Sequence, residues 1–162
     1  MSEDTPANWW RIYTEPLPLP VRLHGLSIRG RRADDGTLIV EVCAPPSSDQ
    51  PARATPLPHL ARHSPTGFEC GYGGSGPADL ARSIVGFLCG TDDPHPALAD
   101  QFKWKVVALM PRRGWRLSTE ALWQRLLDCA RELGARCPAC LDRKGGCTLC
   151  HPVSSVSASV SA

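Results

Sequence analysis

The chain has 162 residues, of which 42% are hydrophobic and 21% charged, and its formal net charge at pH 7 is +2. This composition is typical of a soluble globular domain with a small appendage, and the low net charge does not demand a nucleic-acid or membrane partner. No apolar run approaches the roughly 20 residues that span a bilayer. The acidic, polar start at residues 1–4 does not resemble a signal peptide. We therefore expect a cytoplasmic protein.

The first predicted elements are two strands. Residues 1–10 carry no hydrophobic period and are expected to be flexible. Residues 21–28 predict a short strand, and the β-branched residues 37–42 predict a better one. Asp34-Asp35-Gly36 between them is a turn signal, so the two strands are expected to form a hairpin. Six prolines within residues 44–65 predict a long loop.

Three helices are predicted next, each with start and stop signals. The first is expected over residues 77–90, with proline at the first helical position and glycine at its end. The second is expected over residues 94–111, although residues 106–110 could instead form a strand. The third is the clearest, because Ser118 is a good N-cap and Gly134 closes the apolar face.

Together these elements predict an α+β fold, in which a small N-terminal hairpin or sheet packs on about three helices over residues 11–134. A zinc-knuckle segment is predicted at residues 135–151. The serine-rich, low-complexity residues 152–162 are expected to form a disordered tail.

Four cysteines near the C-terminus form two Cys-x-x-Cys pairs. Such pairs offer four thiolates to a tetrahedral ion, so the sequence predicts one structural zinc site without an open catalytic position. The predicted ligands are Cys137, Cys140, Cys147 and Cys150. The remaining cysteines are scattered, and we interpret them as small buried apolar groups. They are Cys43, Cys70, Cys89 and Cys129.

Alternatives to this zinc site stay open. The two pairs lie closer together than the about 15 to 20 residues that separate the pairs of common zinc sites. Cys147, Cys150 and His151 also fit the c-type haem attachment pattern, although no export signal is visible. A reduced tail without metal is another alternative. If zinc does bind, His151 could replace one cysteine ligand.

The glycine-rich residues 71–77 are the most unusual stretch. They match Gly-x-Gly-x-x-Gly and are expected to open a helix, where backbone amides favour phosphate. Asp92 and Asp93 follow at about the distance of a ribose-binding acid. The candidate ligand-binding residues are Gly71, Gly73, Gly74, Ser75 and Gly76. The alternative is a tight turn that lets the helix pack closely, because the other units of a dinucleotide-binding fold are missing.

The same stretch carries a resemblance to a known family. Gly-Tyr-Gly-Gly-Ser-Gly-Pro and the residues after it resemble an uncharacterised family of bacterial, archaeal and phage domains of unknown function. The other residues that carry the resemblance are Phe102, Lys103, Val106, Val107, Ala108, Trp115 and Leu117. The resemblance covers roughly residues 13–134 and implies a compact α+β domain. It implies no activity, and no catalytic residue is assigned.

A basic stretch interleaved with Trp104 and Trp115 is the candidate nucleic-acid contact. Its cations are Lys103, Lys105, Arg112, Arg113 and Arg116. A solvated face explains this stretch equally well. The leading hypothesis is a zinc-stabilised, non-enzymatic binding or adaptor protein whose partner is a protein or a nucleic acid. The alternative is a nucleotide-binding protein or enzyme that uses residues 71–77.

Overall fold

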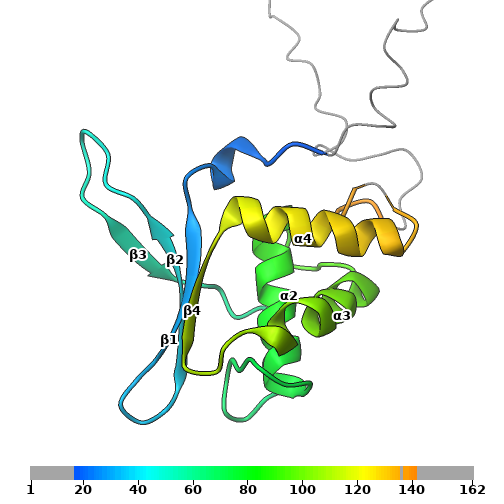
Figure 1. Cartoon of the computed structure of the whole chain (residues 1–162), viewed down its shortest axis with the longest axis horizontal. Helices are drawn as coiled ribbons and strands as arrows, with labels where there is room; N and C mark the ends of the chain where they lie inside the picture. The colour runs from blue at the N-terminus through cyan, green and yellow to red at the C-terminus, as the bar shows by residue number, and fades with distance from the viewer. Residues whose placement is uncertain (1–16, 136, 142–162) are drawn as a thin grey trace, which may run out of the picture.

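The computed structural model describes residues 17–135 and 137–141. A four-stranded antiparallel sheet carries three helices on one of its faces (Figure 1), which confirms the α+β class. The strands are β1 (Ser27–Arg32), β2 (Leu38–Ala44), β3 (Arg53–Pro56) and β4 (Gly114–Ser118), in the order β3-β2-β1-β4. The helices are α2 (Ser75–Cys89), α3 (Pro96–Lys105) and α4 (Thr119–Glu132), and two short 3-10 turns are η1 (Val21–Leu23) and η2 (Val107–Leu109).

The predicted hairpin is present as β1 and β2. Gly36 in its turn has a φ of 84°, and the carboxylate of Asp35 accepts a hydrogen bond from the backbone amide of Thr37 at 2.9 Å. The predicted start of the first strand was wrong, because β1 begins only at Ser27. Gly25 has a φ of 73°, which breaks the extended chain before the strand.

Two strands were not predicted from the sequence, and both lie at the edges of the sheet. β3 is inside the proline-rich stretch that was expected to be a loop. Pro56 fits there because an edge strand tolerates a residue without a backbone donor. β4 pairs with β1 on the other side, so β1 becomes an inner strand.

The three predicted helices are present, with changed ends. α2 starts at Ser75 and ends at Cys89, and Gly90 after it has a φ of 68°, which is the expected left-handed cap. α3 is shorter than predicted, since the chain turns into η2 rather than into further helix or a strand. At α4, the hydroxyl of Ser118 accepts a hydrogen bond from the amide of Ala121 at 3.1 Å, which confirms the predicted N-cap.

The core lies between the sheet and the helices. Trp123 and Phe102 are fully buried there, and the ring of Trp115 lies flat against Gly30 of β1. The four scattered cysteines are buried, as expected. Burial raises the pKa of Cys129 to about 11, so its thiol stays protonated.

Within the described residues, no helix combines the length and apolar character needed to cross a membrane.

Candidate nucleic-acid interface

The glycine-rich loop leads directly into α2 and packs against aromatic side chains. A Cβ atom at Gly73 would lie 2.1 Å from the ring of Trp104, and one at Gly74 would lie 2.6 Å from the ring of Tyr72. Gly71 has a φ of 80°, and its amide donates to the carbonyl of Val107 at 3.0 Å. The positive φ of Gly71 favours glycine, and a side chain at Gly73 or Gly74 would force the neighbouring ring to move, which agrees with the tight, closely packed turn that was the alternative.

The aromatic rings of this loop remain accessible to solvent. Tyr72 is 40% exposed and Trp104 is 55% exposed, and they are the two aromatic residues among the exposed large hydrophobic side chains of the described residues. Each ring has a cation over it. The ammonium of Lys103 lies 4.6 Å from the centre of the Trp104 ring, and the guanidinium of Arg112 lies 5.2 Å from the centre of the Tyr72 ring.

These residues form one surface, which we call the Gly-loop surface: residues 71–76 with Lys103, Trp104 and Arg112. Two candidate sites that are separate in the sequence meet here. The positive end of the α2 dipole points at the loop, and no acidic residue in the first turn of the helix offsets it. The surface therefore combines apolar ring faces with positive charge.

Arg32 at the end of β1 joins two backbone segments that flank the Gly-loop surface. Its guanidinium forms a two-pronged ion pair with Glu69, at 2.8 and 2.7 Å, and donates to the carbonyl of Arg112 at 2.8 Å. The hydrogen bonds from Arg32 hold the pKa of Glu69 below its usual value. Arg32 therefore fixes both the segment before the glycine loop and the backbone of Arg112. The sequence analysis did not identify it.

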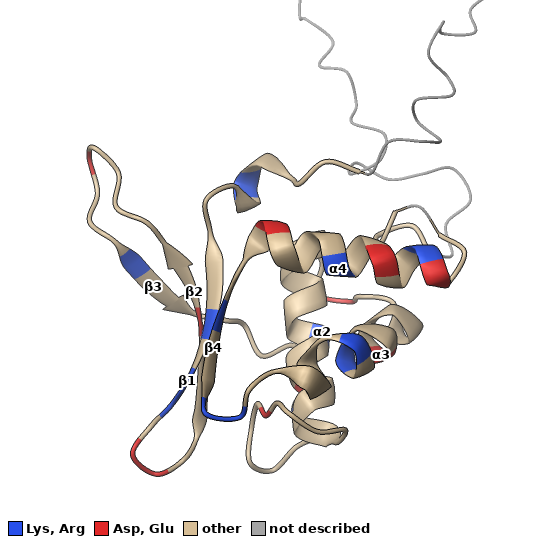
Figure 2. Cartoon of the chain, in the orientation of Figure 1, with Lys and Arg blue, Asp and Glu red and all other residues tan. Residues whose placement is uncertain are grey.

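The five predicted nucleic-acid contacts do not form a single patch. Lys103 pairs with Asp100 on its own helix, and Lys105 pairs with Glu132 of α4. Arg112 belongs to the Gly-loop surface. Arg113 and Arg116 have no acidic partner among the described residues, and Arg116 lies on the face of the sheet away from the helices. Figure 2 shows the basic residues along β1, β4 and the loop before β4.

A second cluster, which the sequence analysis did not find, joins two histidines to a buried carboxylate. Asp79 of α2 is 1% exposed on its side chain and accepts from Nδ1 of His63 at 2.8 Å. It also accepts from the backbone amides of His63 at 2.8 Å and Ser64 at 2.9 Å. His59 stacks on Phe68 with ring centres 3.9 Å apart, and burial lowers its pKa. Asp79 thus fastens the loop after β3 to α2, and no nucleophile contacts the histidines among the described residues.

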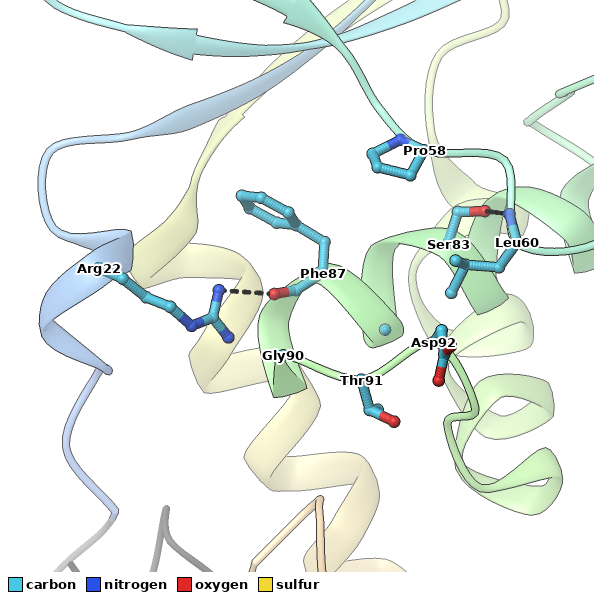
Figure 3. Close-up of a pocket in the computed structure, with 9 residues that line it drawn as sticks. Arg22, Pro58, Leu60, Ser83, Phe87, Gly90, Thr91 and Asp92 are labelled. Atoms are coloured by element: carbon cyan, nitrogen blue, oxygen red, sulfur yellow. Dashed lines mark hydrogen bonds between the residues drawn. The ribbon is translucent and has the colours of Figure 1, made fainter.

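A hollow of about 260 Å³ lies at the other end of α2 (Figure 3). Arg22 reaches across it and donates to the carbonyls of Phe87 at 2.8 Å and Leu88 at 2.7 Å. On the opposite wall, the hydroxyl of Ser83 accepts from the amide of Leu60 at 3.1 Å. The guanidinium of Arg22 therefore binds the last carbonyls of α2, and Ser83 holds the loop at Leu60. Because these polar groups already have structural partners, we assign no ligand to the hollow.

Half of the predicted zinc site lies in the described residues. The amide of Cys140 donates to the carbonyl of Cys137 at 3.1 Å, so the first Cys-x-x-Cys pair closes a turn. Cys137 is only 4% exposed, and Ala139 and Leu141 pack against the core. The other two predicted ligands, Cys147 and Cys150, lie outside the described residues, as do His151 and the predicted tail.

A family model described as a family of unknown function, DUF6166, matches residues 28–128. This is more than half of the chain, and the chain belongs to that family. The matched range includes the glycine loop, most of α4 and all four strands, with the exception of Ser27, the first residue of β1. Comparisons with curated proteins and with solved structures gave no significant match.

Proposed function

We propose that this member of the DUF6166 family is a non-enzymatic binding protein that contacts single-stranded nucleic acid through the Gly-loop surface. The observation that carries the proposal is the pair of exposed rings, Tyr72 and Trp104, each with a cation over it. Exposed aromatic faces bind unpaired bases by stacking, and neighbouring cations bind the phosphates.

The geometry favours a single strand over a duplex. A ring can stack only on a base whose face is free, and the bases of a duplex already cover one another. Trp104 and Tyr72 contact consecutive glycines of the loop, so the two partly exposed rings lie next to one stretch of backbone. Arg112 and the N-terminus of α2 provide positive charge beside them.

Binding of a fluorescent oligothymidylate to the full chain, measured by anisotropy at two salt concentrations, tests the proposal. Trp104→Ala should weaken binding by about 1–3 kcal/mol, because one stacking contact is lost. Arg112→Ala should weaken binding at low salt and lower its dependence on salt. Arg125→Ala is the matched control, since Arg125 is exposed on α4 and outside the Gly-loop surface.

Trp104→Phe separates contact from misfolding. This variant keeps a stacking face but removes the indole, so affinity should be largely retained while quenching of tryptophan fluorescence by the oligonucleotide decreases. If the wild-type chain does not bind, or if Trp104→Ala binds as the wild type does with an unchanged unfolding midpoint, the proposal is wrong.

A second candidate is binding of a free nucleotide at the glycine loop. It is favoured by the position of the loop at the N-terminus of a helix of 15 residues that has no side-chain cap. Thermal stabilisation by a mononucleotide, lost in Gly73→Val but kept in Trp104→Ala, would support it. Loss in both variants would instead support stacking on Trp104.

We also propose that the four C-terminal cysteines hold a structural zinc ion. Support comes from the turn at Cys137 and Cys140 and from the packing of this segment against the core. Zinc would supply folding energy to a segment that has no core of its own. Purified protein should contain about one zinc per chain, and a chelator should increase the number of thiols that react with a titrant. Protein without stoichiometric metal would contradict this proposal.

A further inference from the structure

The sheet has a second face, turned away from the helices, whose charged residues are mostly arginine. Side chains alternate along a strand, so Ile28 and Gly30 face the core while Arg29 and Arg31 face outward. Among the described residues, no helix lies on the outward side (Figure 1). We call this side the outer sheet face and define its charged residues by position. They are Arg29 and Arg31 of β1, Glu41 of β2 and Arg116 of β4.

The charges of this face are unbalanced. Arg29 is the partner of Glu41 on one side and of Arg116 on the other, so the three residues form one row across three strands. One oxygen of Glu41 accepts from Arg29 at 2.8 Å and from Arg31 at 3.2 Å. Two of the three guanidinium groups therefore share a single carboxylate, and the third, Arg116, does not contact it.

The positive charge of Arg116 is not balanced by an acidic side chain among the described residues. Its guanidinium donates to the hydroxyl of Ser27 at 3.0 Å, and no acidic side chain contacts it among the described residues. Its direct neighbour across the strands is Arg29, and like charges in that position destabilise a sheet. A negatively charged ligand over the row would remove this repulsion.

We infer that the outer sheet face binds the phosphate backbone of the same strand whose bases stack at the Gly-loop surface, so this inference rests on the proposed function. Arg112 and Arg113 connect the two surfaces along the chain. Arg113 is exposed, and it lies three residues before Arg116, or about 10 Å in an extended strand. In Figure 2 the basic residues continue from this loop along β4 and β1. Charge complementarity therefore favours a polyanion that crosses the edge of the sheet.

The test is a comparison of oligothymidylates of about 4 and about 16 nucleotides, a range of typical single-strand site sizes. The variant Arg31→Thr, Arg116→Thr removes two positive charges and leaves the Arg29–Glu41 ion pair in place. For the longer strand, we expect about tenfold weaker binding at low salt and a salt dependence reduced by about 1.4 in the log–log slope, since two phosphate contacts are lost. Binding of the short strand, which reaches only the Gly-loop surface, should not change.

The matched control is Arg125→Ala, Arg131→Ala, which makes the same change in net charge on α4 and should bind both strands as the wild type does. Unchanged affinity and slope in the outer-face variant, while Trp104→Ala still weakens binding, would overturn this inference and leave the proposed function standing. Equal losses for the short and the long strand would also overturn it. If polyglutamate competed at the outer sheet face and the oligonucleotide did not, the occupant would be an acidic protein segment and the inference would be wrong.

Discussion

The inner and outer faces of the sheet are built from the same strands, yet they follow different rules. The inner face carries Ile28, Val40 and Val42, all 9% exposed or less, and a glycine where the Trp115 ring needs space. The outer face carries three arginines and one glutamate. The difference follows from the period of two along a strand: one set of alternate side chains packs in the core, and the other set contains the exposed charges, although Cys43 in that second set is itself buried. The following changes probe that division.

The largest expected effect comes from Ile28→Ala on the inner face. Ile28 is fully buried, so its truncation should lower the free energy of unfolding by about 2–5 kcal/mol through lost contacts and a cavity. Urea denaturation followed by circular dichroism measures this. Arg31→Ala on the outer face of the same strand should change it by less than about 0.5 kcal/mol. Similar losses for both variants would contradict the division between the faces.

Gly30→Ala should cost somewhat less, about 1–3 kcal/mol, because an added methyl would lie 2.5 Å from the Trp115 ring and force it to move. The near-ultraviolet circular dichroism of the tryptophans should change along with the unfolding midpoint. Ser27→Ala in the same strand is the control, since it adds nothing to the inner face. A Gly30→Ala protein with wild-type stability would show that the ring is not closely packed.

Glu69→Gln tests a place where a residue in register with the inner face, Arg32, carries charge and has an acidic partner. Loss of the carboxylate from this partly buried pair should lower the unfolding free energy by about 1–2 kcal/mol at neutral pH. The pKa of Glu69 is lowered in the folded state, so its stabilisation is present above the unfolded pKa and is lost as pH falls through the folded one. The variant should therefore lose less stability than the wild type on acidification. Parallel pH profiles would contradict this.

The smallest expected effect comes from Arg116→Thr. Removing one member of the like-charge pair with Arg29 should raise the unfolding free energy by a few tenths of a kcal/mol, and at most about 1 kcal/mol. The gain should shrink at high salt, where surface charges are screened. Thermal unfolding at low and high ionic strength measures both. A clear loss of stability would mean that Arg116 has a structural role.

The elements that sequence reasoning predicted are those encoded by local signals. Ser118 caps α4 because its hydroxyl accepts a hydrogen bond from the amide of Ala121, three residues along the chain. Gly90 closes α2 because glycine adopts a positive φ without strain. The bounds of β1 were predicted wrongly because Arg29, Arg31 and Arg32 occupy half of its six positions and hide the apolar alternation. β3 was missed because it lies in a proline-rich stretch and ends in a proline itself, and proline is typical of a loop as well as of an edge strand.

The candidate site was predictable only in parts. The glycine loop and the basic stretch were each visible as motifs, but their meeting depends on Trp104 packing against Gly73 and Arg112 lying over Tyr72. The support from Arg32 and the attachment of His63 to Asp79 join residues far apart in the chain. No local spacing encodes such contacts, so a single sequence did not show them.

The pairing of β1 with β4 has a consequence for how the protein is made. Residue 27 pairs with residue 118, so during translation the first hairpin leaves the ribosome long before its last strand exists. Until then, one edge of β1 is open to other nascent chains. Repulsion between the arginines of such hairpins would discourage them from aggregating edge to edge. The charge that we assign to ligand binding in the mature protein would thus also protect the chain while it is being synthesised.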